Sequence, residues 1–194
     1  MDKQKITEYF DAHACNWDKG LLHEDDKINA ILDYADIGKG ARVLDVACGT
    51  GVLFKDYLNR GVSSVTGVDI SSKMIHAAQN KFNDARITLI CADIENISFD
   101  ESFDRCVVYN AFVHFPSPEK LISALCGDIA DKGRLCIAHS MSRHALAAHH
   151  SGSASEVSVQ LMDENALAAI MSKYFEVDVK ISDDEMYVVS GIKK

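Results

Sequence analysis

The chain has 194 residues, of which 47% are hydrophobic and 25% are charged, a composition typical of one globular domain (1–194) with a full core. Acidic residues outnumber lysine and arginine by 29 to 20, which gives a formal net charge of -9. No basic run is present that could neutralise a row of phosphates, so we do not expect a nucleic-acid partner.

The N-terminal segment MDKQKITEYFDAH (1–13) lacks the uninterrupted apolar core of a signal peptide, and no run of about 18 apolar residues predicts a membrane-spanning helix. We therefore expect a cytoplasmic protein without membrane insertion. The six cysteines are scattered singly, without a CxxC pair, and most lie in or beside apolar runs. Reduced and mostly buried thiols are expected.

Five short apolar runs alternate with amphipathic stretches along the chain. They are RVLDVA (42–47), SVTGVDI (64–70), ITLICAD (87–93), FDRCVVYNA (103–111) and GRLCIAHS (133–140). Each run is nearly continuous in apolar residues rather than strictly alternating, which is typical of parallel strands covered by helices on both faces. The pattern predicts an α/β fold with a doubly wound, Rossmann-like sheet.

The helices between these runs have recognisable first residues. Helices are predicted after Ser71 or Ser72, after Ser117 with Pro118 in the first turn, and after Asp163. Two further runs, 175–182 and 185–194, are separated by the acidic turn 183–184 and predict an antiparallel hairpin. The hairpin would complete a seven-stranded sheet that is otherwise parallel.

The strongest motif is VLDVACGTG (43–51), a strand that ends in a tight glycine turn before a helix. Gly49 and Gly51 lack a Cβ, so a ligand can lie close to the backbone and to the free N–H groups at the helix start. A dinucleotide site would need a third glycine where this chain has Phe54, so NAD is not favoured. Asp45 beside the turn would repel phosphate but suits a cationic amino group, which favours S-adenosylmethionine.

Two more carboxylates are expected at strand ends beside this turn. Asp69 ends the second strand, where it could accept both hydroxyls of a ribose, and Asp93 ends the third. A single aspartate at such a position is more often a helix cap. Three of them around one glycine turn indicate a nucleotide site.

These motifs resemble those of the class I S-adenosylmethionine-dependent methyltransferases over about residues 5–140, particularly the small-molecule group that includes the ubiquinone and menaquinone C-methyltransferases. In that comparison Ala47 replaces the usual first glycine, a variant that the family tolerates. YFDAHACNWD (9–18) is similar to a segment that folds over the cofactor, although core packing would explain its aromatic residues equally well. The resemblance implies cofactor contacts from Tyr9, Trp17, Asp45, Ala47, Gly49, Gly51, Asp69, Ile70, Met74, Asp93, Ile94, Asn110 and Ala111.

Methyl transfer is an in-line displacement, so the enzyme must chiefly hold the acceptor in place and exclude water. Acceptors that start protonated also need a base. The candidates follow the fourth and fifth strands: His139 is preferred, with His114 and Tyr109 as further catalytic candidates and Asn110 nearby. Either histidine could instead have a structural role.

The segment HSMSRHALAAHHSGSASE (139–156) is expected to form a substrate lid. It contains His139, His144, His149, His150 and Glu156. The five-residue spacings do not place the first three histidines on one helical face, so we assign no metal site. A pH-sensitive or anion-binding histidine cluster and plain solvated histidines both remain open.

The predicted domain divides into an N-terminal helical cap (1–40), a cofactor-binding core (41–140), a lid loop (141–162) and a last helix with the closing hairpin (163–194). It has no large insertion to grip a macromolecule, and its YNAF sequence (109–112) differs from the NPPY type of enzymes that methylate bases or glutamine. We expect a small-molecule acceptor and a monomer or homodimer, with the acceptor atom undetermined. The alternatives are a cofactor-binding protein without transferase activity, whose histidine-rich loop binds a metal or partner, and, less favoured, aminopropyl transfer.

Overall fold

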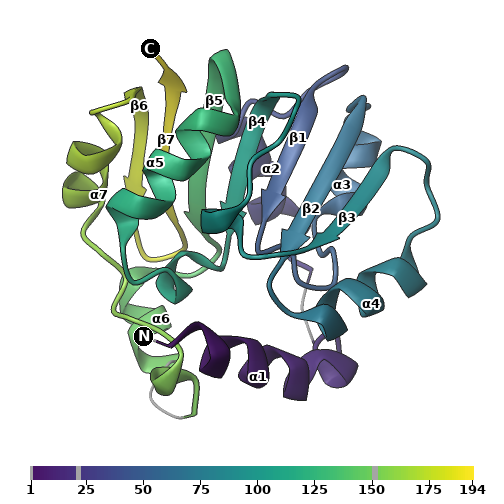
Figure 1. The fold of residues 1–194 in the computed structure, drawn as a ribbon. Helices are drawn as coiled ribbons and strands as arrows, with labels where there is room; N and C mark the ends of the chain where they lie inside the picture. Colours follow the sequence, from purple (N-terminus) through teal and green to yellow (C-terminus); the bar gives the residue numbers. More distant parts are fainter. Residues whose placement is uncertain (1, 21–22, 150–152) are drawn as a thin grey trace.

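A computed structural model describes residues 2–20, 23–149 and 153–194, and its centre is a seven-stranded sheet (Figure 1). The strands are β1 (Arg42–Val46), β2 (Ser64–Asp69), β3 (Ile87–Cys91), β4 (Phe103–Tyr109), β5 (Ile129–His139), β6 (Phe175–Ser182) and β7 (Tyr187–Lys193). Their order is β3-β2-β1-β4-β5-β7-β6, with β7 antiparallel to both of its neighbours and all other pairs parallel. The predicted doubly wound sheet with a closing hairpin is confirmed.

Seven α-helices and four 3₁₀ turns lie within the described residues. The helices are α1 (Lys3–His13), α2 (Asp25–Tyr34), α3 (Phe54–Asn59), α4 (Ser72–Lys81), α5 (Pro118–Asp128), α6 (Arg143–His149) and α7 (Glu164–Met171), and the turns are η1 (Ala14–Asn16), η2 (Ile94–Asn96), η3 (Phe112–His114) and η4 (Ser153–Glu156). Ser71 and Asp163 cap α4 and α7 through side-chain oxygens that accept backbone N–H groups, as predicted. None of the described helices is long and apolar enough to cross a membrane.

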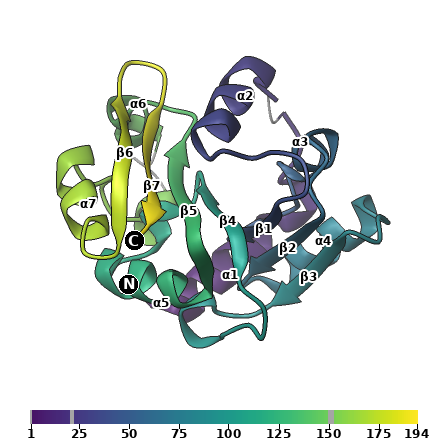
Figure 2. The ribbon, with the colours of Figure 1, turned by 90° about the horizontal axis from the view of Figure 1, so that it is seen from above.

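The two faces of the sheet carry separate apolar clusters. Helices α2 and α5 lie on opposite sides of the sheet in Figure 2. Side chains of α5 and α7 pack on one face, including Leu125 and Met171. Side chains of α2 and α3 pack on the other, including Leu32 and Tyr57. Burial on both faces explains why the strand sequences are apolar without strict alternation.

The structure corrects several predicted boundaries. β3 ends at Cys91, and Asp93 lies beyond it as the cap of η2, where its carboxylate accepts the Glu95 N–H at 3.1 Å. β4 ends at Tyr109 because Asn110 takes a left-handed conformation. β5 begins earlier than predicted, at Ile129, and its pairing with β4 shifts register through a bulge.

The predicted lid loop is also partly wrong, because residues 143–149 form helix α6. Apolar burial orders this part of the chain: Leu146, Val157 and Leu161 are each 8% exposed or less. The thiols also differ from expectation, since Cys91 is exposed rather than buried in its strand. The division of the chain into four functional segments remains a prediction.

Helix α1 lies across the carboxyl ends of the parallel strands and runs below the sheet in Figure 1. Together with η1 and the two residues that follow η1, it forms a segment (3–18) that we call the roof. Polar side chains of three roof residues bind it to the loops that follow the strands: Lys3 pairs with Asp93, Asp11 accepts the Ser71 hydroxyl at 2.6 Å, and Asp18 accepts the Thr50 hydroxyl at 2.6 Å. These partners follow β3, β2 and β1 respectively, so the roof spans the loops where ligands of such sheets bind.

Phe54, the first residue of α3, packs where two glycines provide space. A Cβ on Gly67 of β2 would lie 2.6 Å from Phe54 Cζ, and one on Gly51 would lie 2.7 Å from Phe54 Cδ2. Phe54 itself is fully buried. Phe54, which stands where a dinucleotide motif would have its third glycine, therefore packs the glycine turn against β2.

We expect Gly67→Ala to lower the free energy of unfolding by about 1–3 kcal/mol, because its Cβ would overpack against Phe54 and Cys48. The matched control is Gly127→Ala in α5, whose Cβ meets nothing within 4 Å and should stabilise the helix by about 0.5–1 kcal/mol. Urea unfolding measures both, and equal stability of Gly67→Ala and wild type would contradict the packing.

Candidate functional site

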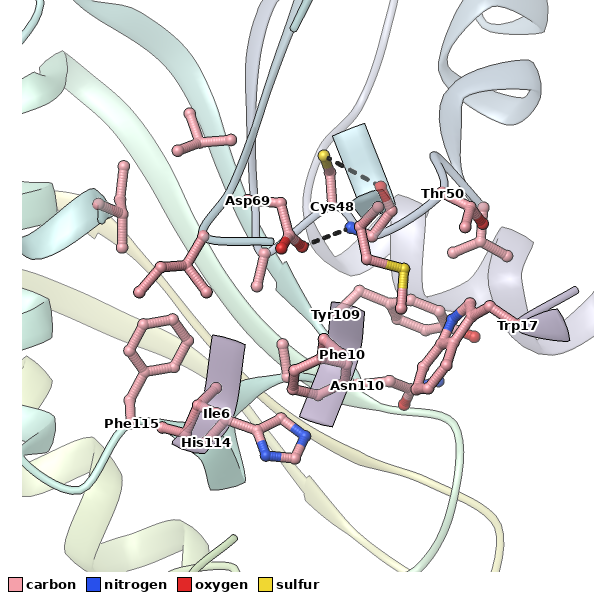
Figure 3. A pocket seen from close by; sticks show the side chains of 18 of the residues that line it. Ile6, Phe10, Trp17, Cys48, Thr50, Asp69, Tyr109, Asn110, His114 and Phe115 are labelled. Atoms are coloured by element: carbon pink, nitrogen blue, oxygen red, sulfur yellow. Dashed lines mark hydrogen bonds between the residues drawn. The ribbon is translucent and has the colours of Figure 1, made fainter. Parts of the chain in front are cut away.

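A cavity of about 580 Å³ lies between the roof and the carboxyl ends of β1, β2, β3, β4 and β5 (Figure 3). Its volume is within the range of about 300–1,000 Å³ that is typical of small-molecule sites. The cavity is lined by Lys3, Ile6, Phe10, Trp17, Gly20, Glu24, Ile28, Ala47, Cys48, Gly49, Thr50, Val52, Val68, Asp69, Ile70, Met74, Ala92, Asp93, Ile94, Glu95, Tyr109, Asn110, Ala111, His114, Phe115, Pro116, Ser140, Met141 and Leu146.

Asp69 joins the glycine turn to the end of β2. One carboxylate oxygen accepts the Gly49 N–H at 2.8 Å, and the other accepts the Ser71 N–H at 2.8 Å (Figure 3 shows the first). Burial raises the pKa of this carboxyl, and the two N–H groups oppose that effect by favouring the ionised form. Each oxygen retains acceptor capacity for a further donor, such as a ribose hydroxyl.

Three residues of the turn take left-handed conformations: Ala47, Gly49 and Gly51 have φ values of 55°, 55° and 79°. The first glycine of the family motif would adopt this conformation without strain, whereas Ala47 adopts it at a steric cost. Among the described residues, a Cβ on Gly49 would have only the Trp17 indole nitrogen within 4 Å, at 3.9 Å. The backbone at Gly49 is therefore open to a ligand.

Asp45 lies behind the turn rather than on the cavity wall, with 3% of its surface exposed. The pKa of its carboxyl is raised to about 8. Burial is the largest cause, the charge of Asp69 adds to the rise, and the Tyr57 hydroxyl opposes it. Asp45 is therefore mostly protonated at neutral pH. Its predicted contact with a cationic amino group remains a prediction.

One wall of the cavity carries a charged cluster formed by Lys3, Asp93 and Glu95. The Lys3 ammonium contacts Asp93 and lies 2.5 Å from Glu95 Oε2, whose side chain is 3% exposed. The Asp93 carboxylate also accepts the Asn96 amide at 2.6 Å. Lys3 was not singled out from the sequence, because nothing local indicates that a residue of α1 meets a loop 90 positions away.

The ends of β4 and β5 are tied together at the opposite wall. The Asn110 amide donates to Ser140 Oγ at 3.0 Å, and its carbonyl accepts the Ser140 N–H at 2.8 Å. Burial raises the pKa of Tyr109 above its ordinary value, against smaller lowering effects of Ser140 and Asn110. Tyr109 thus remains a neutral phenol at physiological pH and is better suited to donate a hydrogen bond than to act as a base.

His114 lies on the cavity wall, where its Nδ1 is 2.7 Å from the carbonyl oxygen of Val157. A carbonyl only accepts, so Nδ1 carries the proton and Nε2 is the basic nitrogen of the neutral ring. Phe10 of the roof packs edge-on against the imidazole, with centroids 5.0 Å apart. The predicted lid segment thus orients this histidine through one backbone carbonyl.

His139, the preferred catalytic candidate, lies elsewhere. It is the last residue of β5, has no exposed surface, and packs edge-on against Tyr187 at 6.3 Å. It does not line the cavity, whereas its neighbour Ser140 does. His139 is paired with Tyr187 of β7 within the sheet, whereas Ser140 follows the last residue of β5 and lies at the carboxyl end of the strand, where the cavity is.

The other predicted residues divide as follows. Most of the predicted cofactor residues line the cavity, namely Trp17, Ala47, Gly49, Asp69, Ile70, Met74, Asp93, Ile94, Asn110 and Ala111. Tyr9, Asp45 and Gly51 do not, and Tyr9 instead stacks on His13 at 4.3 Å. No sequence pattern indicated Phe10, Glu24, Thr50 or Ser140, which line the cavity because the roof and the strand ends converge there.

The lid histidines are not gathered around one point. His144 is exposed on α6, His139 is buried in β5, and the His149 side chain and His150 lie outside the described residues. In the described part of the chain, no group of three or more His, Cys, Asp or Glu side chains is arranged to hold a metal ion.

Residues 43–133 match the family model described as "Methyltransferase domain". The chain is 30% identical over 135 residues to the malonyl-[acyl-carrier protein] O-methyltransferase of Acetivibrio thermocellus, covering 66% of this chain and 48% of the relative. It is 32% identical over 149 residues to the ubiquinone biosynthesis O-methyltransferase of Neisseria meningitidis serogroup C, covering 69% of this chain and 60% of the relative. The chain thus spans about half to three fifths of these relatives.

Among solved structures, the fold is similar to the N-methyltransferase NodS of Bradyrhizobium japonicum in complex with S-adenosyl-L-homocysteine, with a TM-score of 0.76. The match covers 97% of this chain and 98% of that chain at 14% sequence identity. At this identity the likeness supports the fold alone.

We expect Asp45→Asn to change the pH dependence of stability. Above the ordinary pKa of about 4, the unfolded state releases the Asp45 proton, whereas the folded state keeps it up to a pH of about 8. This group therefore makes the free energy of unfolding fall as the pH rises from about 4 to about 8. The Asn variant lacks that decline and should gain stability relative to wild type as the pH approaches 8.

Urea unfolding at several pH values measures this difference. Asp104→Asn is the control of opposite sign, because its hydrogen bonds with Arg42 lower the pKa of Asp104. Identical pH profiles for wild type and Asp45→Asn would show that folding does not raise the pKa of Asp45.

Proposed function

Because the chain belongs to the class I S-adenosylmethionine-dependent methyltransferases, we propose that it transfers a methyl group from this cofactor to a hydroxyl oxygen of a small, uncharged, largely apolar acceptor. The family match does not favour a binding protein without transferase activity or an aminopropyl transferase. The observation that carries the choice of a hydroxyl acceptor is the oriented imidazole of His114 on the cavity wall.

The residues fit the cofactor in chemistry and in space. Asp69 would accept ribose hydroxyls, the open backbone at Gly49 would lie against the amino-acid part, and Asp93 with Ile94 would flank the adenine. When bound, S-adenosylmethionine supplies an activated methyl group on a positively charged sulfur. The roof covers this position and would exclude water during transfer.

The acceptor would occupy the part of the cavity near the ends of β4 and β5. Phe115, Met141 and Leu146 give this part an apolar wall, and Tyr109 and Ser140 add neutral polar groups. Among the described lining residues the one lysine or arginine is Lys3, which is paired with two carboxylates. A carboxylate acceptor, as in the malonyl relatives, would therefore lack a countercharge, whereas an uncharged alcohol or phenol would not need one.

A hydroxyl acceptor must lose its proton as the oxygen is methylated. His114 would take that proton on Nε2, since the Val157 carbonyl keeps the other nitrogen protonated. Tyr109, a neutral phenol, would donate a hydrogen bond rather than accept the proton. A cytoplasmic location, a monomeric or homodimeric state and the absence of a nucleic-acid partner remain predictions.

We expect Asp69→Ala to weaken binding of S-adenosylmethionine and S-adenosylhomocysteine by tenfold or more, a loss of at least about 1.4 kcal/mol, because it removes the ribose acceptor and frees the Gly49 turn. Isothermal titration calorimetry measures this, with the exposed Asp100→Ala as the charge control. Failure of the wild type to bind either compound would overturn the proposed function.

We expect His114→Asn to lower kcat by about 10²-fold or more with S-adenosylhomocysteine binding unchanged, because Asn can still donate to the Val157 carbonyl but offers no base. The assay follows S-adenosylhomocysteine formation with alcohol, phenol, amine and carboxylate acceptors.

His139→Asn is the matched comparison, and we expect it to lower stability rather than turnover per folded molecule, because His139 is buried away from the cavity. Loss of turnover in His139→Asn with normal turnover in His114→Asn would reverse the two assignments. A preference for carboxylate acceptors would reject the proposed acceptor class.

A further inference from the structure

Two aromatic rings of the roof face the cavity beside the glycine turn (Figure 3). The Trp17 indole nitrogen lies 3.9 Å from the position that a Cβ on Gly49 would occupy. Phe10 packs edge-on against Trp17, with centroids 5.4 Å apart, and against His114 at 5.0 Å. The two rings therefore extend from the glycine turn to the histidine that would deprotonate the acceptor.

Trp17 is held in this place by its neighbour Asp18. The Asp18 carboxylate accepts the Thr50 hydroxyl at 2.6 Å and the Lys81 ammonium at 2.9 Å, and Lys81 also donates to Thr50 at 3.2 Å. Thr50 lies within the glycine turn and is 1% exposed. This network of Asp18, Thr50 and Lys81 fixes the end of the roof to the turn and to α4.

No lysine or arginine among the described lining residues lies beside Trp17. Lys3, the one lysine or arginine among the described lining residues, lies at the opposite end of α1, which has eleven residues and is about 16 Å long. Its ammonium is paired with Asp93 and Glu95. A cation beside Trp17 would therefore have two aromatic rings nearby and no unpaired lysine or arginine among the described lining residues.

We propose that Trp17 and Phe10 form an aromatic wall that favours the positively charged sulfonium of S-adenosylmethionine over the neutral thioether of S-adenosylhomocysteine. The proposal rests on the proposed use of this cofactor, whose sulfur links the ribose to the amino-acid part. The residues assigned to those two parts, Asp69 and Gly49, share a hydrogen bond of 2.8 Å, and the Trp17 indole nitrogen lies 3.9 Å from the Cβ position of Gly49. The attraction of a cation to an aromatic ring disappears when methyl transfer removes the charge, so the wall favours release of product.

The test compares the affinities of the two compounds for wild type, Trp17→Leu and Trp17→Phe by isothermal titration calorimetry. Loss of packing weakens both compounds alike, whereas loss of the ring face weakens only the charged one. We expect Trp17→Leu to reduce the affinity for S-adenosylmethionine about three- to tenfold more than that for S-adenosylhomocysteine. Trp17→Phe retains a ring and should keep most of the difference.

Trp17 is the only tryptophan in the chain, so its fluorescence reports directly on this position. Asp18→Asn removes the charge that pairs with Lys81 and should shift the emission toward that of a solvent-exposed indole. The same variant should move the ratio of the two affinities toward that of Trp17→Leu. Asp100→Asn, an exposed carboxylate outside the cavity, should change neither quantity.

The outcomes separate the two proposals. If wild type binds neither compound, the proposed function itself is wrong. If it binds both, and Trp17→Leu lowers the two affinities by the same factor or changes neither, the aromatic wall does not distinguish charge and the inference is overturned. Retained S-adenosylhomocysteine binding in Trp17→Leu shows that the variant is folded.

Discussion

The carboxylate of Asp69 accepts two backbone N–H groups from different loops, and the rest of the site is arranged around this pair of bonds. Gly49 belongs to the loop after β1, and Ser71 caps the helix after β2. A buried carboxylate is costly unless hydrogen bonds compensate it, so the two loops and Asp69 stabilise one another. The shape of the glycine turn thus depends on the loops that follow two strands and not on its own sequence alone.

The cavity exists because the roof is held over this junction by residues far away in the chain. Its contacts fall on the loops after three adjacent strands, at Asp93, Ser71 and Thr50. Individual exposed ion pairs contribute little to stability, but Thr50 and Ser71 are almost fully buried, and their hydroxyls need partners. The contacts with these three loops therefore also determine where the aromatic residues of the roof lie.

The second wall of the cavity depends on a different long-range contact. The Val159 N–H donates to the Val113 carbonyl at 2.8 Å, and the Val157 carbonyl meets His114. Burial of Val157 holds this segment against η3. The chemistry proposed for His114 consequently depends on a part of the chain more than 40 residues later, which also carries α6 and the apolar side chain of Leu146 to the cavity.

The sequence by itself determined the parts that depend on local patterns. Continuous apolar runs indicated the parallel strands, and Ser71 and Asp163 indicated helix starts. The spacing of Asp45, Gly49 and Gly51 indicated the turn. All three signals are local, because strand periodicity, capping and left-handed conformations are properties of short segments. Only the tertiary structure decided which side chains meet. It placed Lys3 beside Asp93, turned Ser140 toward the cavity and His139 away from it, and folded α6 where a loop was predicted. In each case the deciding factor is a contact between elements that lie far apart in the sequence, such as the pairing of His139 with Tyr187.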